Sequence, residues 1–175
     1  MQTVERPPLA DPAGQRHRWP ALLAAVVLVA GAAQWWRTHP DRFGPVGNQT
    51  GITAEVGQMA SASAVLPTGH AVRLRSVEPV VAPGSAAAAI HVQVCNARGN
   101  VLGAGRGLIT RHCTSLSPID GQLMLDDESP YVLVTIVPLE PGTVLVEGFD
   151  VTYDDGWRHG TERTGQSVEV TTIDA

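Results

Sequence analysis

Two cysteines and two histidines are the residues of this chain best suited to hold a soft metal ion: His91, Cys95, His112 and Cys113. Zinc and copper sites combine thiolate and imidazole ligands at fixed geometry. On an extended strand, however, His91 and Cys95 lie about 13 Å apart, and the adjacent His112 and Cys113 point to opposite faces. A disulfide between Cys95 and Cys113 closes a loop of about 19 residues, which contributes roughly 3 kcal/mol in the chain-entropy model. We expect this disulfide, with no metal and no cofactor.

Acidic turns and glycine-rich segments are the next places where chemistry is conceivable. Residues 126–128 and 154–155 are acidic and offer carboxylate oxygens for calcium, but the alternating spacing of a calcium loop is missing. Residues 103–107 hold three glycines without the lysine of a phosphate-binding loop. The G-x-S-x-G signature of a serine nucleophile does not occur. These observations favour a protein that is not an enzyme.

A third group, Trp157, Arg158 and His159, follows the hairpin signal Asp154-Asp155-Gly156. A large aromatic residue beside an arginine in a polar turn is typical of a protein interface. We therefore expect these three side chains to be exposed and to contact a partner. The alternative is that Trp157 packs over the end of its own domain.

Alternating segments after residue 69 predict the strands that must position these residues. Val72 and Leu74 alternate with arginines, and residues 86–95 alternate in the same way, as in half-buried strands. Residues 131–137 are nearly continuously apolar and predict a central strand buried on both faces. Residues 143–153 alternate with a period of two, and this pattern predicts an inward face made of Leu145, Phe149, Val151 and Tyr153. Residues 157–166 read as a hydrophilic excursion before a last strand at 167–173. With no helical period after residue 36, the sequence predicts an all-β antiparallel sandwich.

The segment Trp19–Trp36 contains no charged residue. As a helix it reaches about 27 Å, close to the thickness of a hydrocarbon core, and its terminal tryptophans suit the headgroup regions. A signal peptide also fits, because Ala30-Gly31-Ala32 matches a cleavage pattern. Trp35-Trp36-Arg37 is instead typical of an interfacial stop. We expect an uncleaved, single-pass transmembrane helix.

The remaining residues divide around this segment. Residues 1–18 are rich in proline and polar residues and predict a disordered cytoplasmic tail. Residues 37–68, with repeated glycine, proline and small residues, predict a flexible stalk or linker. Residues 69–175 form the predicted β-sandwich domain. Three arginines before the span against Arg37 and Arg42 after it give a positive-inside bias. We therefore expect a cytoplasmic N-terminus and an extracytoplasmic domain at the cell membrane, which agrees with a disulfide.

Charge is distributed unevenly along the chain. Residues 37–119 carry seven arginines and three acidic residues, whereas residues 120–175 carry two arginines and twelve acidic residues. An acidic ectodomain argues against nucleic acid as a partner. All 12 basic residues are arginine, which indicates the codon usage of a GC-rich genome such as that of an actinobacterium.

The final hairpin, with Tyr153 late in a strand, resembles the last two strands of immunoglobulin-like domains. The whole layout resembles uncharacterised actinobacterial single-pass membrane proteins with an immunoglobulin-like β-sandwich ectodomain, a resemblance of pattern that implies no activity. We expect a non-catalytic interaction or accessory module that binds an envelope protein. Two alternatives stay open: a secreted β-sandwich that binds a small ligand or cell-wall component after signal cleavage, and a metal-dependent envelope protein.

Overall fold

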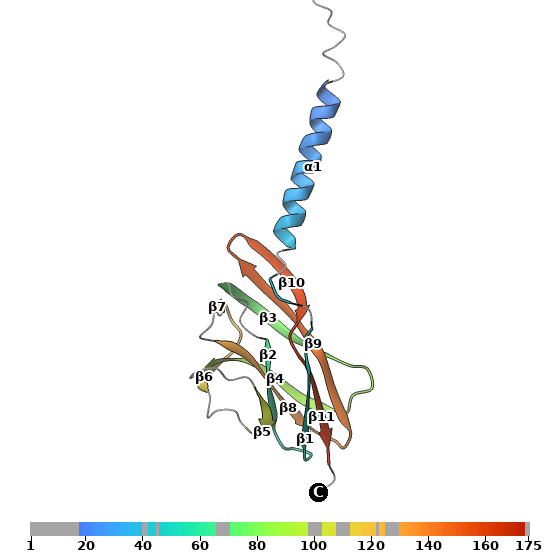
Figure 1. The fold of residues 1–175 in the computed structure, drawn as a ribbon, viewed down its shortest axis with the longest axis vertical. Coiled ribbons are helices and arrows are strands. Elements are labelled where there is room, and N and C mark those ends of the chain that lie inside the picture. The colour runs from blue at the N-terminus through green and yellow to red at the C-terminus, as the bar shows by residue number, and fades with distance from the viewer. Residues whose placement is uncertain are drawn as a thin grey trace, which may run out of the picture. The chain divides into compact units, whose positions relative to one another are not determined.

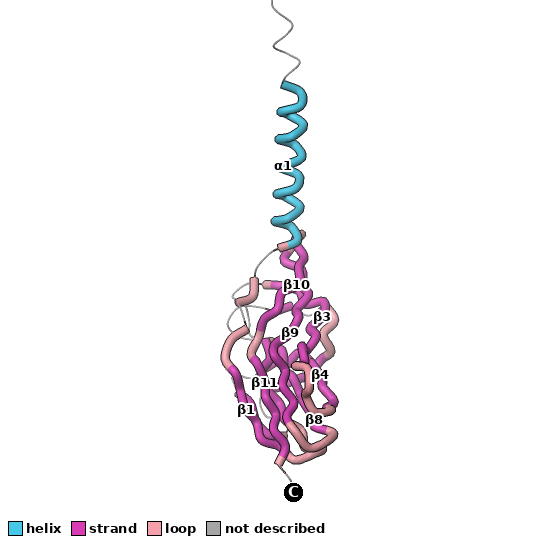
Figure 2. The backbone as a smooth tube through the Cα atoms, turned by 90° about the vertical axis from the view of Figure 1, so that its right-hand side faces the viewer, coloured by secondary structure: helices cyan, strands magenta, loops and turns pink. Residues whose placement is uncertain are grey.

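The computed structural model describes residues 18–39, 42–44, 46–65, 71–97, 103–107, 113–121, 123–124 and 130–173. Contacts within the chain divide it into two compact units, Met1–Trp36 and Arg37–Ala175. Figures 1 and 2 show the long helix α1 and a second unit made of strands. The chain is therefore mostly β with one N-terminal helix.

Helix α1 (Arg18–Thr38) confirms the helical prediction for Trp19–Trp36. Pro20 stands in its first turn, where the missing N–H costs no hydrogen bond. Large apolar side chains are exposed along its whole length, from Trp19 to Trp36. Residues 19–38 are long and apolar enough to cross a membrane, a property that they share with signal sequences.

Sheet A is built around the long strand β9. In spatial order it contains β1 (Gln49–Ala54), β11 (Ser167–Thr172), β9 (Thr143–Asp155), β3 (Val72–Val81) and β7 (Leu123–Met124), with β10 (Arg158–Thr164) also paired to β9. Strand β11 pairs with the first part of β9 and β10 with the second part, so these two short strands follow one another along the same edge. The β1–β11 pair is parallel, whereas the other pairs of the sheet are antiparallel.

Sheet B is antiparallel and centred on β8. Its order is β5 (Ala104–Arg106), β2 (Ala60–Val65), β8 (Tyr131–Pro138), β4 (Ala88–Ala97) and β6 (Cys113–Ser117). All eight residues of β8 except Val137 are buried, which confirms the prediction of a central strand covered on both faces. One apolar cluster takes side chains from both sheets, and its largest fully buried members are Tyr153, Phe149, Leu74 and Ile136. The two sheets therefore share a single core.

The prediction that residues 37–68 are a flexible linker is wrong. Strands β1 and β2 lie in this range, and every residue of β2 is buried. Ala60, Ala62 and Ala64 belong to the shared core. Alanine and serine gave this segment the composition of a linker, but small side chains are also what a strand closely covered on both faces requires.

Two local predictions in the C-terminal region also need correction. Residues 158–164 form strand β10 and are not an excursion. In β9 the inward residues before Gly148 are Val144 and Val146, so the prediction that Leu145 faces inward is wrong. After Gly148 the predicted residues Phe149, Val151 and Tyr153 are buried. Val80 of β3 pairs with Gly148 and Val81 pairs with Val146, so the pairing skips Glu147. This β-bulge in β9 moves the alternation by one residue and explains the change.

Candidate functional site

The β9–β10 hairpin carries the residues that the sequence marked as an interaction site. Asp155 pairs with Arg158 across the hairpin, so Gly156 and Trp157 form a two-residue turn. Gly156 has a φ of 62°, as the primed turns of tight hairpins require. The hairpin signal in the sequence is therefore confirmed, and the turn places Trp157 at the tip.

The three predicted contact residues differ in exposure. Trp157 is 59% exposed and His159 is also exposed, whereas Arg158 is only 8% exposed. The prediction that all three are surface residues is thus wrong for Arg158. Its guanidinium donates to the carbonyl oxygen of His39 at 3.2 Å and lies 3.8 Å from a carboxylate oxygen of Asp155. Arg158 joins the hairpin to the residue that follows α1.

A connecting segment, defined as the described residues 39, 42–44 and 46–48, lies against this hairpin. Arg42 donates from its side chain to Asp155 at 2.7 Å. Asp155 therefore holds two arginines, Arg42 and Arg158. Further along, the hydroxyl of Thr164 donates to the carbonyl of Gly44 at 2.6 Å. The chain between α1 and β1 is thus fixed to the domain at several points.

Glu162 of β10 is the main polar contact of the connecting segment. Its carboxylate accepts hydrogen bonds from the backbone N–H groups of Arg42, at 2.9 and 3.1 Å, and of Phe43, at 2.8 Å. It also accepts one from the hydroxyl of Tyr153. Burial, and then the bond to Glu162, raises the pKa of Tyr153 above its ordinary value. The ring of Phe43 packs edge-on against that of Tyr153 with centroids 4.9 Å apart. Glu162 therefore holds both the connecting segment and a core tyrosine.

This arrangement was missed by sequence reasoning. Glu162 stands in a hydrophilic stretch, and its partners Arg42 and Phe43 lie about 120 residues away in the chain. The apolar Phe43, within a segment rich in glycine and proline, was the one signal that this region packs onto something.

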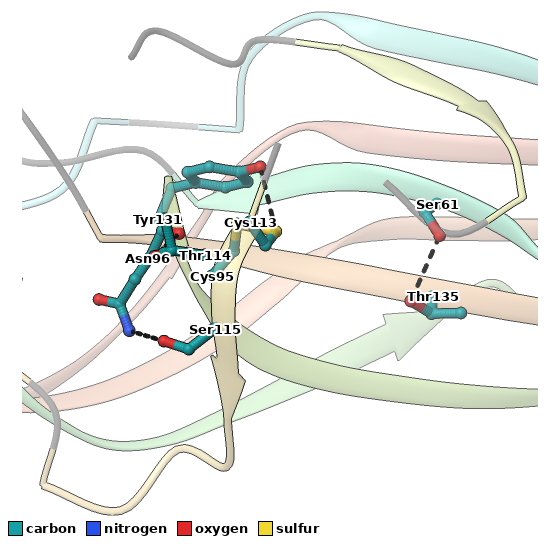
Figure 3. The surroundings of a disulfide bond; sticks show 8 residues. All are labelled: Ser61, Cys95, Asn96, Cys113, Thr114, Ser115, Tyr131 and Thr135. Atoms are coloured by element: carbon teal, nitrogen blue, oxygen red, sulfur yellow. Dashed lines mark hydrogen bonds between the residues drawn. A yellow bond between two sulfur atoms is a disulfide. The ribbon is translucent and has the colours of Figure 1, made fainter. Parts of the chain in front are cut away.

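A second group surrounds the disulfide between Cys95 of β4 and Cys113 of β6 (Figure 3), whose Cα atoms are 5.4 Å apart. The predicted pairing is present in the structure. Cys95 is buried with Tyr131 and Leu133 in a small apolar cluster separate from the main core. The hydroxyl of Tyr131 lies 3.8 Å from the sulfur of Cys113, and burial raises the pKa of Tyr131.

The disulfide removes both thiolates from the set of metal ligands suggested by the sequence. Both sulfur atoms are bonded to each other, so neither is available as a thiolate ligand. His91 is exposed on β4, and His112 lies outside the described residues. The described residues contain no group of three or more metal-ligating side chains.

The acidic residues that suggested calcium have other partners where they are described. Asp154 accepts from Arg75 at 2.6 Å, and Asp155 is bound by Arg42. Residues 126–128 lie outside the described part of the chain. At the hairpin, therefore, these carboxylates serve structure by neutralising arginines.

No family model matches this chain, and no curated protein is similar to it in sequence. The helix, the disulfide and the hairpin are therefore the features of the chain that bear on its function.

Proposed function

We propose that this protein is a membrane-anchored, extracytoplasmic β-sandwich that acts as a non-catalytic interaction or accessory module for a protein partner in the cell envelope. One observation carries the proposal: an exposed apolar helix long enough to cross a membrane precedes a β domain that holds a disulfide. The actinobacterial origin indicated by the all-arginine composition belongs to the same proposal.

The immunoglobulin-like character of the sandwich is supported by strand order. Strands β3, β9 and β11 lie together in one sheet, and β2, β8 and β4 lie together in the other. Taken in chain order, these groups correspond to strands C, F, G and B, E, D of immunoglobulin-like domains. The disulfide departs from that pattern, because it joins two neighbouring strands of one sheet instead of bridging the two sheets.

An extracytoplasmic position for the domain is supported by the Cys95–Cys113 disulfide, because such bonds persist in oxidising compartments. The arginines that precede α1 favour the same orientation. A secreted form is the second candidate, since α1 also has the length and composition of a signal sequence and contains Ala30-Gly31-Ala32. The mass of the mature N-terminus separates the two.

Co-purification from native membranes tests the proposed interaction. The full chain, carrying a C-terminal tag, is cross-linked in its own membrane and isolated in mild detergent. We expect one partner in a fixed ratio to the chain. The matched control replaces residues 19–36 with an unrelated apolar span, which keeps the anchor and the domain. If the domain binds the partner, the control retains it; a chain that elutes alone from cross-linked membranes would contradict the proposal.

A further inference from the structure

The β9–β10 hairpin contacts, next to its tip, the residue that follows α1 in the chain. Arg158, next to the tip residue Trp157, donates to the carbonyl of His39, which is the residue after the end of α1 at Thr38. Three Cα steps separate His39 from Trp36, which limits their separation to about 11 Å. This limit follows from the chain alone. When Trp36 is at the membrane–water boundary, His39, the residue that Arg158 contacts, is therefore within about 11 Å of that boundary.

The side chains at the tip suit the headgroup region of a bilayer. Indole places its ring among the lipids and keeps its N–H hydrated, which is why tryptophan concentrates at membrane interfaces. Trp157 is 59% exposed, and α1 already ends in two tryptophans, Trp35 and Trp36.

Electrostatics at the tip do not oppose contact with anionic lipids. The two carboxylates that precede the turn are bound by arginines: Asp154 by Arg75, and Asp155 by Arg42 and Arg158. Arginine pairing at these distances removes most of the repulsion that free carboxylates would exert within a Debye length of a negative surface. His159 is exposed beside the tip and carries no negative charge.

We propose that Trp157 inserts into the headgroup region of the bilayer crossed by α1, so that the β9–β10 hairpin is a second membrane contact of the domain. This inference rests on the proposed membrane anchor. Two points of attachment, the helix and the hairpin tip, restrict the tilt of the domain and so fix which of its surfaces faces a partner in the envelope.

A lipid surface fits the tip better than a protein does. Stable protein interfaces use about 20 to 30 residues on each side, whereas the exposed residues of the tip are Gly156, Trp157 and His159. Arg158 is buried against the connecting segment. A single indole is sufficient for an interfacial lipid contact.

Fluorescence of a single tryptophan in the full chain tests the inference. The substitutions Trp19→Phe, Trp35→Phe and Trp36→Phe leave Trp157 as the one indole of the chain. The protein is reconstituted into vesicles of phosphatidylcholine and phosphatidylglycerol, some of which carry a quencher on the lipid headgroup. We expect emission at shorter wavelength than that of an indole in water, strong quenching by the headgroup label and weak quenching by acrylamide.

The matched control moves the indole to the other end of the domain. Leu139 is also 59% exposed and precedes β9, whereas Trp157 follows it; the thirteen residues of β9 span about 40 Å. In the same background, Trp157→Phe with Leu139→Trp should give emission as in water, quenched by acrylamide and not by the headgroup label.

The possible results distinguish failure of the lipid contact from failure of the membrane anchor. If vesicle flotation shows the chain in the membrane but Trp157 behaves as the Leu139→Trp control does, the lipid contact is overturned while the anchor stands. If the chain does not float with the vesicles, the anchor itself has failed. If Trp157 becomes protected in native membranes but not in lipid vesicles, the tip contacts a protein, and this outcome also overturns the lipid proposal.

Discussion

The chain has two tyrosines, Tyr153 and Tyr131. Tyr153 belongs to the core shared by the two sheets, and Tyr131 belongs to the small apolar cluster beside the disulfide. Burial raises the pKa of both, and the bond to Glu162 raises that of Tyr153 further. The ordinary pKa of tyrosine is about 10. Below that value both hydroxyls stay protonated in the folded and in the unfolded chain. The two tyrosines then make no pH-dependent contribution to the free energy of unfolding. Above it, the unfolded chain ionises first, and the free energy of unfolding falls as pH rises.

We therefore predict that phenolate absorbance of the folded protein rises at higher pH than that of the protein in urea. The free energy of unfolding should decrease as pH rises above about 10 and should continue to fall until the raised pKa values of the folded tyrosines are reached. The chain contains no lysine, so tyrosine is the side chain that dominates titration in this range. Tyr153→Phe should reduce the alkaline loss of stability. Two tyrosines that titrate normally in the folded protein would contradict the prediction.

Glu162 is the residue whose charge holds the connecting segment. The Glu162→Gln substitution leaves one carbonyl oxygen to serve two backbone N–H groups and the hydroxyl of Tyr153. Because partly buried donors lose a charged acceptor, we expect a loss of about 1–3 kcal/mol in the free energy of unfolding. Urea unfolding of the full chain in detergent measures it. The control is Glu147→Gln on exposed β9 surface, expected within about 0.5 kcal/mol of the parent; equal effects of the two substitutions would argue against the role of Glu162.

At the scale of elements, the sequence predicts those strands and turns that have a local pattern of alternating apolar residues or a turn motif. It identifies β3, β4, β8 and the β9–β10 turn because branched apolar residues and Asp-Gly carry direct signals. It misses β2 because Ala60–Val65 consists of small residues that a covered strand and a linker share. It also misplaces Leu145, because the bulge at Glu147 of β9 depends on pairing with β3, which the local sequence does not show.

In the candidate site, too, the properties with a local sequence pattern could be predicted and those set by distant contacts could not. The exposure of Trp157 and His159 follows from a polar turn and could be predicted. The burial of Arg158 could not, because it requires His39 and Asp155 to meet across the fold. Contacts between residues so far apart in the sequence are set by tertiary structure and leave no local pattern.

The junction between β10 and β11 depends on a glycine. Gly165 has a φ of 92°, and a Cβ at this position would meet the carbonyl of Ala64 and lie 2.9 Å from the ring of Phe149. Gly84 has a similar φ of 84°, but its Cβ would meet no atom. Gly84→Ala should therefore cost only the backbone strain, about 1–2 kcal/mol. Gly165→Ala adds a clash with sheet B and should cost about 3 kcal/mol or more in the free energy of unfolding. Equal losses in thermal or urea unfolding would exclude close packing at this junction.

At the scale of the whole molecule, the fate of residues 1–36 decides what the domain is attached to. The connecting segment is bound to the domain through Glu162 and Arg158, and these bonds involve only residues after 36. Cleavage after Ala32 would leave them in place, so the folded domain is compatible with both fates. The discriminating property is the small-residue pattern at Ala30 and Ala32.

We predict that the mature chain keeps its N-terminal residues, resists extraction from membranes by alkaline carbonate, and has no free thiol before reduction. The substitutions Ala30→Leu and Ala32→Leu remove the cleavage pattern and lengthen the apolar run. If α1 is an anchor, they change the mass only by the substituted atoms and leave the chain in the membrane fraction. If α1 is a signal peptide, the parent chain begins at Ala33 and is soluble, and the variant accumulates uncleaved in the membrane. Mass spectrometry of both chains, with a thiol count before and after reduction, separates these outcomes, because the anchor requires identical processing of parent and variant.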